Sequence, residues 1–237
     1  MRGFMAFLTV LACCSLTPGQ KAISFPTTDG GIVFADIYGA SSKGVVLAHG
    51  GRFNKESWAK QARILEGAGF EVLALDFRGF GQSHGPGDSN LDDAPFEQDV
   101  LAAVRYMHTH GVTSVSVIGG SFGGAAAGDA SIASAPGEID RLVLLGAAPN
   151  GPADKLKSPV LFIVARDDAN ASGPRLPRIQ QQFDNAPQPK ELIILDGSAH
   201  AQYLFDTDQG ERVMREILRF LNANTGTGAV TRRYKNH

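Results

Sequence analysis

The sequence predicts an α/β fold in which a mostly parallel β-sheet is covered by helices on both faces. Short runs that are apolar throughout, as strands buried on both sides are, alternate with segments of helical periodicity. The chain holds 28 glycines, above the usual share of about 7%, and most of them lie where a strand run gives way to a helical run. The 237 residues show no break in composition, which favours one domain with a full core.

The first third of the chain predicts a hairpin, a helix and two buried strands. The β-rich runs 22–25 and 32–38 are joined by Thr28-Asp29-Gly30-Gly31, and an Asp-Gly turn between such runs is a hairpin signal. The runs 44–48 and 72–75 are continuously apolar, as buried strands are. Between them Asn54 can cap a helix that ends before Gly69.

The rest of the chain continues the alternation. An apolar stripe predicts a helix over 95–108, and the run 115–118 predicts a strand that leads directly into a helix. Further predicted elements are strands at 142–145, 160–164 and 192–195 and helices at 174–183 and 213–221.

The two ends differ from the body. Arg2, an apolar run over 4–12 and the pair Cys13-Cys14 have the order of a secretory signal too short to span a bilayer. The segment 10–13 also resembles a bacterial lipoprotein cleavage site. We therefore expect a leader over residues 1–20 and an exported protein, periplasmic or held at a membrane by an N-terminal lipid. The alternative is a cytoplasmic protein with an N-terminal extension. We expect a catalytic domain over 21–222 and a polar, disordered tail over 223–237.

The amino-acid composition excludes some classes of function. Charged residues make up 19% of the chain and the net charge is −2, so no basic surplus indicates a nucleic-acid partner. A small molecule with little charge is the expected substrate. Both cysteines lie at positions 13 and 14, so the body offers no disulfide framework, structural zinc site or catalytic thiol. We expect no metal or organic cofactor. Nothing in the sequence indicates an oligomeric state.

The segment Gly119-Gly120-Ser121-Phe122-Gly123 carries the strongest chemical signal. A serine in a tight turn from strand to helix projects its hydroxyl from the edge of the sheet, and the glycines two positions away let strand and helix approach. The N–H of Phe122 then lies at a helix N-terminus, where it can stabilise an oxyanion. The pattern predicts Ser121 as a nucleophile.

A nucleophilic serine needs a base and an acid, which follow it in the order acid then histidine in this context. His200 follows the strand at 192–195 and would emerge at the same sheet edge as Ser121. The acid would follow the strand at 160–164, where Asp167 and Asp168 are adjacent. The residues alone leave these two carboxylates open.

Together these segments resemble the α/β-hydrolase fold family of serine hydrolases. The matching pieces are His49-Gly50-Gly51, Asp76-x-Arg78-Gly79-x-Gly81-x-Ser83, Gly119-x-Ser121-x-Gly123, Asp167-Asp168 and Gly197-x-x-His200, over about residues 22–221. The resemblance implies that Asp168 is the triad acid, that Gly51 gives the second oxyanion N–H, and that Asp76 and Arg78 form a structural pair beneath the site. Ala165 replaces a strand-terminal glycine of the family, so Asp167 stays an alternative.

The resemblance also implies an open site without a large cap, since only residues 147–158 separate the two strands between which many relatives insert one. We expect Arg52, Trp58 and Tyr203 to bind substrate. The expected activity is cleavage of small carboxylic esters, or of thioesters or amides, through an acyl-enzyme on Ser121. The alternatives are a peptidase or acyltransferase on the same triad, and a non-catalytic hydrolase-like binding protein.

Overall fold

The computed structural model describes residues 20–223 and 231–233. They form a nine-stranded sheet in the order β1-β2-β4-β3-β5-β6-β7-β10-β11 and a separate hairpin of β8 and β9. The strands are β1 (Gln20–Pro26), β2 (Ile32–Tyr38), β3 (Lys43–Ala48), β4 (Glu71–Leu75), β5 (Ser114–Gly120), β6 (Leu142–Leu145), β7 (Val160–Ala165), β8 (Ala169–Asn170), β9 (Gly173–Pro174), β10 (Lys190–Leu195) and β11 (Thr231–Arg233).

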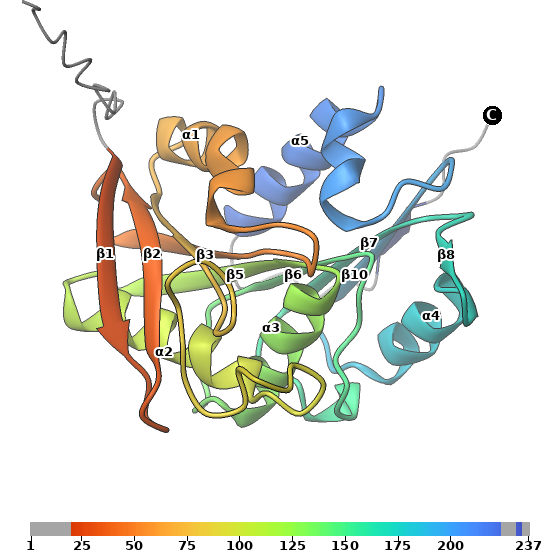
Figure 1. Ribbon diagram of the computed structural model, residues 1–237. Helices are drawn as coiled ribbons and strands as arrows, with labels where there is room; N and C mark the ends of the chain where they lie inside the picture. The colour runs from red at the N-terminus through yellow and green to blue at the C-terminus, as the bar shows by residue number, and fades with distance from the viewer. Residues whose placement is uncertain (1–19, 224–230, 234–237) are drawn as a thin grey trace, which may run out of the picture.

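Helices cover both faces of this sheet, as the sequence predicts. Helices α1 (Ala59–Gly67) and α5 (Gly210–Leu221) lie on one face, and α2 (Phe96–Thr109), α3 (Phe122–Ala133) and α4 (Leu176–Asn185) lie on the other (Figure 1). Short 3₁₀ helices span Lys55–Trp58, Ala153–Lys155 and Ala201–Asp206. Asn54 caps the first of these through its side chain, which accepts from Ser57 N–H, so the predicted cap is present one element earlier than expected.

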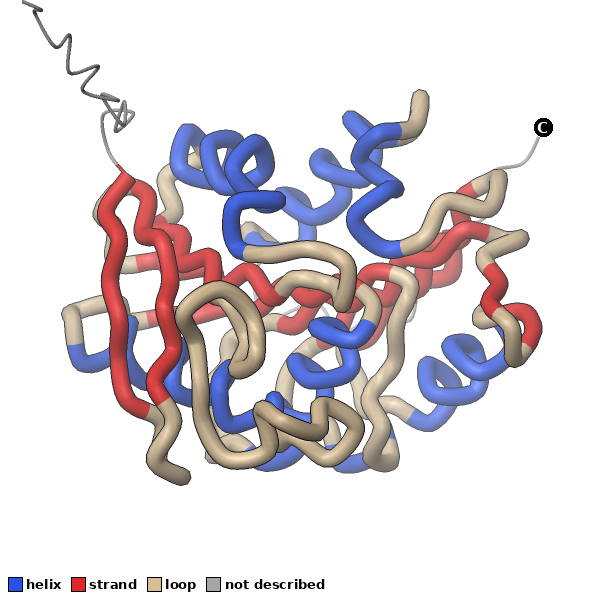
Figure 2. The backbone as a smooth tube through the Cα atoms, viewed as in Figure 1, coloured by secondary structure: helices blue, strands red, loops and turns tan. Residues whose placement is uncertain are grey.

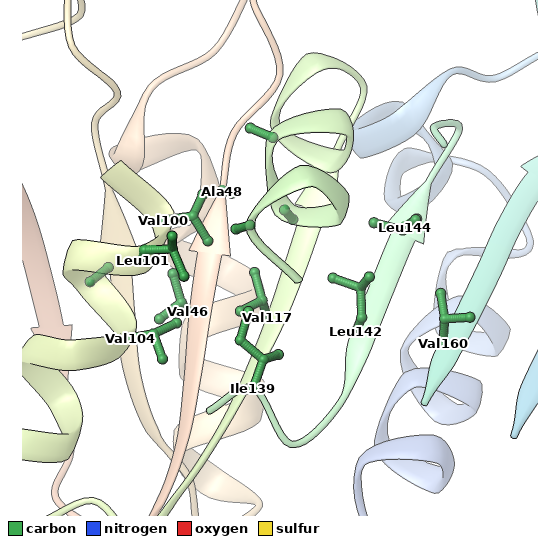
Figure 3. Packing of buried hydrophobic residues seen from close by; sticks show 14 of the residues in the cluster. Val46, Ala48, Val100, Leu101, Val104, Val117, Ile139, Leu142, Leu144 and Val160 are labelled. Atoms are coloured by element: carbon green, nitrogen blue, oxygen red, sulfur yellow. The ribbon is translucent and has the colours of Figure 1, made fainter. Parts of the chain in front are cut away.

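The central strands are buried on both sides because alternate residues face opposite helix layers. In β3, Val46 and Ala48 belong to the core cluster under α2, α3 and α4, whereas Val45 and Leu47 belong to the cluster under α1 and α5. Figure 3 shows Val46 and Ala48 beside Val117 of β5, with Val100 and Val104 of α2 packed over them. Continuous apolar runs are therefore what a doubly covered parallel strand requires.

The pairing is parallel except at one edge of the sheet. Strands β1 and β2 form the predicted antiparallel hairpin, and β2 is antiparallel to β4. From β4 through β3, β5, β6, β7 and β10 every pair is parallel, and Figure 2 shows these strands side by side through the middle of the molecule. Their carboxyl ends meet at one edge, and the segments expected to carry chemistry follow those ends.

The structure describes little of the two predicted terminal segments. Except for Gln20, which opens β1, the expected leader lies outside the described residues. The expected tail departs from our prediction at Thr231–Arg233, which pairs in parallel with residues 191–193 of β10. Thr-Arg-Arg contains no apolar residue, so the sequence offers no hydrophobic periodicity that would predict this strand. None of the helices within residues 20–223 is both long and apolar enough to cross a bilayer.

The predicted pair of Asp76 and Arg78 does not form. Arg78 is buried and binds the carboxylates of Asp99 and Asp29, with Nη2 to Asp99 Oδ1 at 2.7 Å and Nη1 to Asp29 Oδ2 at 2.6 Å. Asp76 instead accepts from the backbone N–H and the ammonium of Lys55. The chain turns directly after β4, where Phe80 N–H donates to the Phe77 carbonyl at 2.9 Å. The two side chains therefore anchor different loops: Arg78 the β1–β2 turn, Asp76 the segment that follows β3.

The contact of Arg78 with Asp29 predicts a loss of stability in acid. Hydrogen bonds from Arg78 outweigh the effect of burial and lower the pKa of Asp29 from 3.8 to about 2. A carboxyl whose pKa is lower in the folded state stabilises the fold above its ordinary pKa, and the benefit disappears as pH falls toward the folded value. We expect Asp29→Asn to melt at a lower temperature than the parent protein above about pH 4, with a gap that closes toward pH 2. Thermal unfolding of both proteins across this range measures it, and a gap that does not change with pH contradicts it.

Candidate active site

The serine turn between β5 and α3 is built as the sequence predicts. Ser121 has φ 54° and ψ −123°, a backbone conformation that side chains rarely adopt and that is retained only where packing enforces it. The packing is visible at the flanking glycines. A Cβ on Gly119 would lie 2.4 Å from the carbonyl oxygen of Gly123, and one on Gly123 would lie 2.3 Å from that of His49. Strand, turn and helix are thus too close for any side chain at these two positions.

Ser121, His200 and Asp168 form a hydrogen-bonded row across three strand ends. His200 Nε2 lies 2.7 Å from Ser121 Oγ, and His200 Nδ1 lies 2.7 Å from Asp168 Oδ2. A carboxylate only accepts hydrogen bonds, so Nδ1 donates to it and Nε2 is left to accept the proton of the serine hydroxyl. The row can therefore move a proton away from Oγ toward Nε2.

The structure places Asp168 rather than Asp167 against the histidine. Strand β7 ends at Ala165, and Asp168 N–H donates back to the Ala165 carbonyl at 3.2 Å. This turn brings the Asp168 side chain inward, where it is 1% exposed. Asp167 is exposed, and its N–H donates to the Gly197 carbonyl.

Two neighbours fix the Asp168–His200 pair. The guanidinium of Arg175 approaches the other carboxylate oxygen, with Nε 3.3 Å from Asp168 Oδ1. On the opposite side Gly146, at φ 58°, leaves no room for a side chain, because a Cβ there would lie 2.9 Å from His200 Nδ1 and 3.1 Å from Asp168 Oδ2. Gly146 follows β6 directly, so four neighbouring parallel strands, β5, β6, β7 and β10, deliver this part of the site.

Two backbone N–H groups near Ser121, those of Phe122 and Gly51, are candidate oxyanion donors. Phe122 is the first residue of α3, and the first N–H groups of a helix have no partner within it. Gly51 follows β3, and its close neighbour is the Phe122 ring, 3.6 Å from where a Cβ would be. The preceding N–H, that of Gly50, is already used, since it donates to Gln202 Oε1 at 2.8 Å.

His49 directly follows β3, beside the loop that carries Gly51, and is buried. Burial lowers the pKa of His49, so the ring is neutral. It can then donate from Nδ1 to the Gly50 carbonyl at 2.8 Å and accept at Nε2 from Phe77 N–H at 3.3 Å. The imidazole ring packs edge-on against the rings of Phe77, Phe80 and Phe122. His49 thus supports the loop that carries Gly51.

A cavity of about 640 Å³ opens over Ser121. Its apolar lining includes Leu91, Phe96, Phe122, Ala125, Ala126 and Ile179. Charged and amide side chains lie around these, and include Asp92, Glu97, Asp129, Asn150, Arg175 and Arg178. Residues 146–159, which join β6 to β7, contribute to the wall of the cavity and form no cap over it.

The predicted substrate-binding residues do not line this cavity. Trp58 is a clear correction: it is 1% exposed and packs edge-on against Phe205, with ring centroids 5.9 Å apart. Tyr203 is 46% exposed and lies against Phe53, and Arg52 is exposed. All three follow a predicted site residue closely in sequence, but none of them belongs to the cavity wall.

The cavity wall that the sequence missed comes from the segments after β6 and β7 and from the loop before α2. These are Gly146–Asn150, Asn170–Ile179 and Leu91–Glu97. The position of the first two after parallel strands was a usable signal, because ligands bind outside the carboxyl ends of such strands. Among the described residues no group of three histidine, cysteine or acidic side chains is arranged to hold a metal ion.

Comparison with solved structures finds the same fold in proteins of low sequence identity. A Thermoplasma acidophilum protein described as a predicted CIB-like hydrolase is 21% identical with a TM-score of 0.67, over 86% of this chain and 99% of that one. Esterases from Rhodococcus and Exiguobacterium antarcticum are 19% and 15% identical, each with a TM-score of 0.69, over 85% and 86% of this chain and 98% and 100% of theirs. At these identities the likeness shows the fold.

Comparison of sequences adds a short match and a long one. A curated Synechocystis protein that carries the provisional name non-heme chloroperoxidase is 43% identical over 56 residues, which are 24% of this chain and 20% of that protein. The sequence model described as alpha/beta hydrolase fold matches residues 44–220, which include every member of the hydrogen-bonded row and both candidate oxyanion donors. The chain therefore belongs to the alpha/beta hydrolase fold family.

Proposed function

We propose that the protein is a serine hydrolase that cleaves small carboxylic esters, thioesters included, through an acyl-enzyme on Ser121. The observation that carries the proposal is the row of Asp168, His200 and Ser121, joined by two contacts of 2.7 Å and opening into a cavity. In this reaction Ser121 Oγ attacks the ester carbonyl carbon while its proton passes to His200 Nε2. Asp168 keeps Nδ1 protonated and stabilises the imidazolium that forms.

The backbone supplies the remaining chemistry. As the C–O bond forms, the carbonyl electrons move onto oxygen, where the N–H groups of Phe122 and Gly51 can receive the negative charge. Collapse of this intermediate expels the alcohol, which takes the proton from His200. Water then attacks the acyl-enzyme by the same route and releases the acid and free Ser121. These are roles we assign to the residues on geometry and chemistry.

A covalent serine probe separates this proposal from a binding protein that only shares the fold. We use a fluorophosphonate, which reacts with activated serines, and follow the mass of the protein. Labelling at Ser121 supports the hydrolase. An unlabelled folded protein that also turns over no ester refutes it. Parallel assays with peptides, and with alcohols as acyl acceptors, test the peptidase and acyltransferase alternatives.

The cavity also predicts a preference for short acyl chains. Because it is open, partly polar and without a cap, long alkyl chains gain little apolar burial, and no lid has to move at a lipid surface. We expect kcat/KM to be higher for p-nitrophenyl acetate and butyrate than for the dodecanoate, and no rise in rate when a substrate passes its solubility limit.

The control for this prediction is a detergent series that keeps the long esters dispersed, so that solubility does not imitate selectivity. Faster hydrolysis of emulsified long-chain esters than of soluble short ones would contradict an open, capless site. It would leave the role of Ser121 intact.

A further inference from the structure

We infer that Gln202 is a positioning residue that holds the oxyanion loop, Gly50-Gly51, in register with Ser121 and His200. The inference rests on the proposed function and goes beyond it, because Gln202 touches no reacting atom. Its carboxamide makes two hydrogen bonds of 2.8 Å: Oε1 accepts from Gly50 N–H and Nε2 donates to Ser57 Oγ. With 6% exposure it is among the buried polar residues of the described structure.

The side chain lies between the segments that carry the chemistry. A Cβ on Gly50 would be 3.5 Å from Gln202 Oε1, and a Cβ on Gly120 would be 3.4 Å from Gln202 Cγ. Gly50 precedes the proposed oxyanion donor and Gly120 precedes the nucleophile. The side chain thus packs against both the oxyanion loop and the serine turn.

The backbone around His200 directs Gln202 to this place. Ala201 has φ 51°, a conformation unfavourable for a residue with a Cβ, and Tyr203 N–H donates to the His200 carbonyl at 3.0 Å. This tight turn separates the two neighbours: His200 faces Ser121, and Gln202 faces Gly50. One short segment therefore sets the base and the oxyanion loop together.

The consequence concerns the N–H of Gly51. The bond to Gln202 fixes the peptide between His49 and Gly50. The next peptide, which carries Gly51 N–H, is held at the Gly50 carbonyl by Phe53 N–H at 3.0 Å and by His49 Nδ1 at 2.8 Å, so its orientation depends on Gly50 staying in place. Without the carboxamide, a buried Gly50 N–H would lack a partner, and loops relax to avoid that cost. Such a relaxation would move the Gly51 N–H off the site where oxyanion charge develops, which costs most in the transition state.

Gln202→Met tests this, because methionine keeps the length and burial but cannot replace either hydrogen bond. Ser57→Ala is the matched control: it removes the partner of Nε2 and leaves the bond to Gly50. Turnover is expressed per active serine, titrated with a fluorophosphonate, so that a merely unfolded fraction drops out. We expect kcat per titrated serine to fall about 10- to 100-fold in Gln202→Met, with KM within about threefold. Ser57→Ala should stay within about threefold of the parent protein.

A transition-state mimic provides the second readout. Ser121 Oγ adds to the carbonyl carbon of a trifluoromethyl ketone. The hemiketal oxygen that results carries negative charge where the oxyanion would form. Its inhibition constant should rise in Gln202→Met by the same factor as kcat/KM falls. Retention of kcat within threefold, or a loss of kcat with unchanged inhibitor affinity, overturns the inference.

Amide hydrogen exchange covers the case in which Gln202→Met does not fold. In the parent protein the Gly50 amide should exchange much more slowly than the Gly51 amide, because only Gly50 donates to a buried acceptor. Rapid exchange at Gly50 overturns the inference without any variant. If instead the parent protein neither reacts with the probe nor cleaves esters, the proposed function fails, while the exchange result still reports on the contact itself.

Discussion

Replacing Ser121 by alanine should leave the fold intact and lower ester turnover by at least about 10³-fold, because the proposed nucleophile is lost while the proposed oxyanion donors stay. The serine side chain makes its contact with His200 at the cavity and not in the core. Alanine keeps the Cβ on which the turn packs, so the strained backbone meets no new clash. Turnover of a soluble ester and the melting temperature, both measured on the same preparation, give the result.

This prediction needs a control for contamination, because a trace of host esterase can imitate residual activity. Two batches of Ser121→Ala should be expressed and purified independently. Neither batch should be labelled by the serine probe. Turnover within tenfold of the parent protein, at equal purity, would remove Ser121 from the proposed role.

The second large effect is expected at the acid. Asp168→Asn should lower kcat by about 10²-fold or more, because an amide can donate to Nδ1 and so favours the wrong tautomer of His200. Nε2 would then carry the proton and could not accept that of Ser121. Asp167→Asn should change kcat far less, since Asp167 is exposed and its backbone contact with Gly197 survives the change.

The adjacent pair makes this a matched comparison, with the same chemistry placed one residue apart. The melting temperature of each variant separates a lost role in catalysis from lost folding. The opposite ranking of the two variants would mean that the turn after β7 differs in solution by one residue and that Asp167 serves His200.

Much of this architecture could be predicted because it depends on local patterns. A strand buried on both faces is apolar throughout, and a turn too tight for a Cβ contains glycine, so the turn at Ser121 and the strands β3, β4, β5, β6, β7 and β10 could be predicted in order. The two-residue strands β8 and β9 were not predicted. The choice between Asp167 and Asp168 was different. It depends on the exact residue at which β7 ends and the turn begins, and the residues alone left it open.

What the sequence did not predict depends on loops that meet only in space. The cavity wall comes from segments after β6 and β7, whereas Trp58, close in sequence to Gly51, packs into the opposite helix layer against Phe205. The family resemblance implied a pair of Arg78 with Asp76, but the partners of Arg78, Asp29 and Asp99, lie on the hairpin turn and on α2. Closeness in sequence to a site residue did not predict which side chains line the cavity, because the direction of the backbone decides which residues a side chain contacts.

The spread of the site along the chain also has a kinetic meaning. Gln202 and Gly50 are 152 residues apart, and His200 and Ser121 are 79 apart. Contacts between such distant residues require large loops to close, which makes them late and slow to form. During synthesis, the serine turn can be complete while its base has not yet been made. On refolding from denaturant, the helical signal should therefore return first, and hydrolysis should resume only when the strand before His200 has joined the sheet.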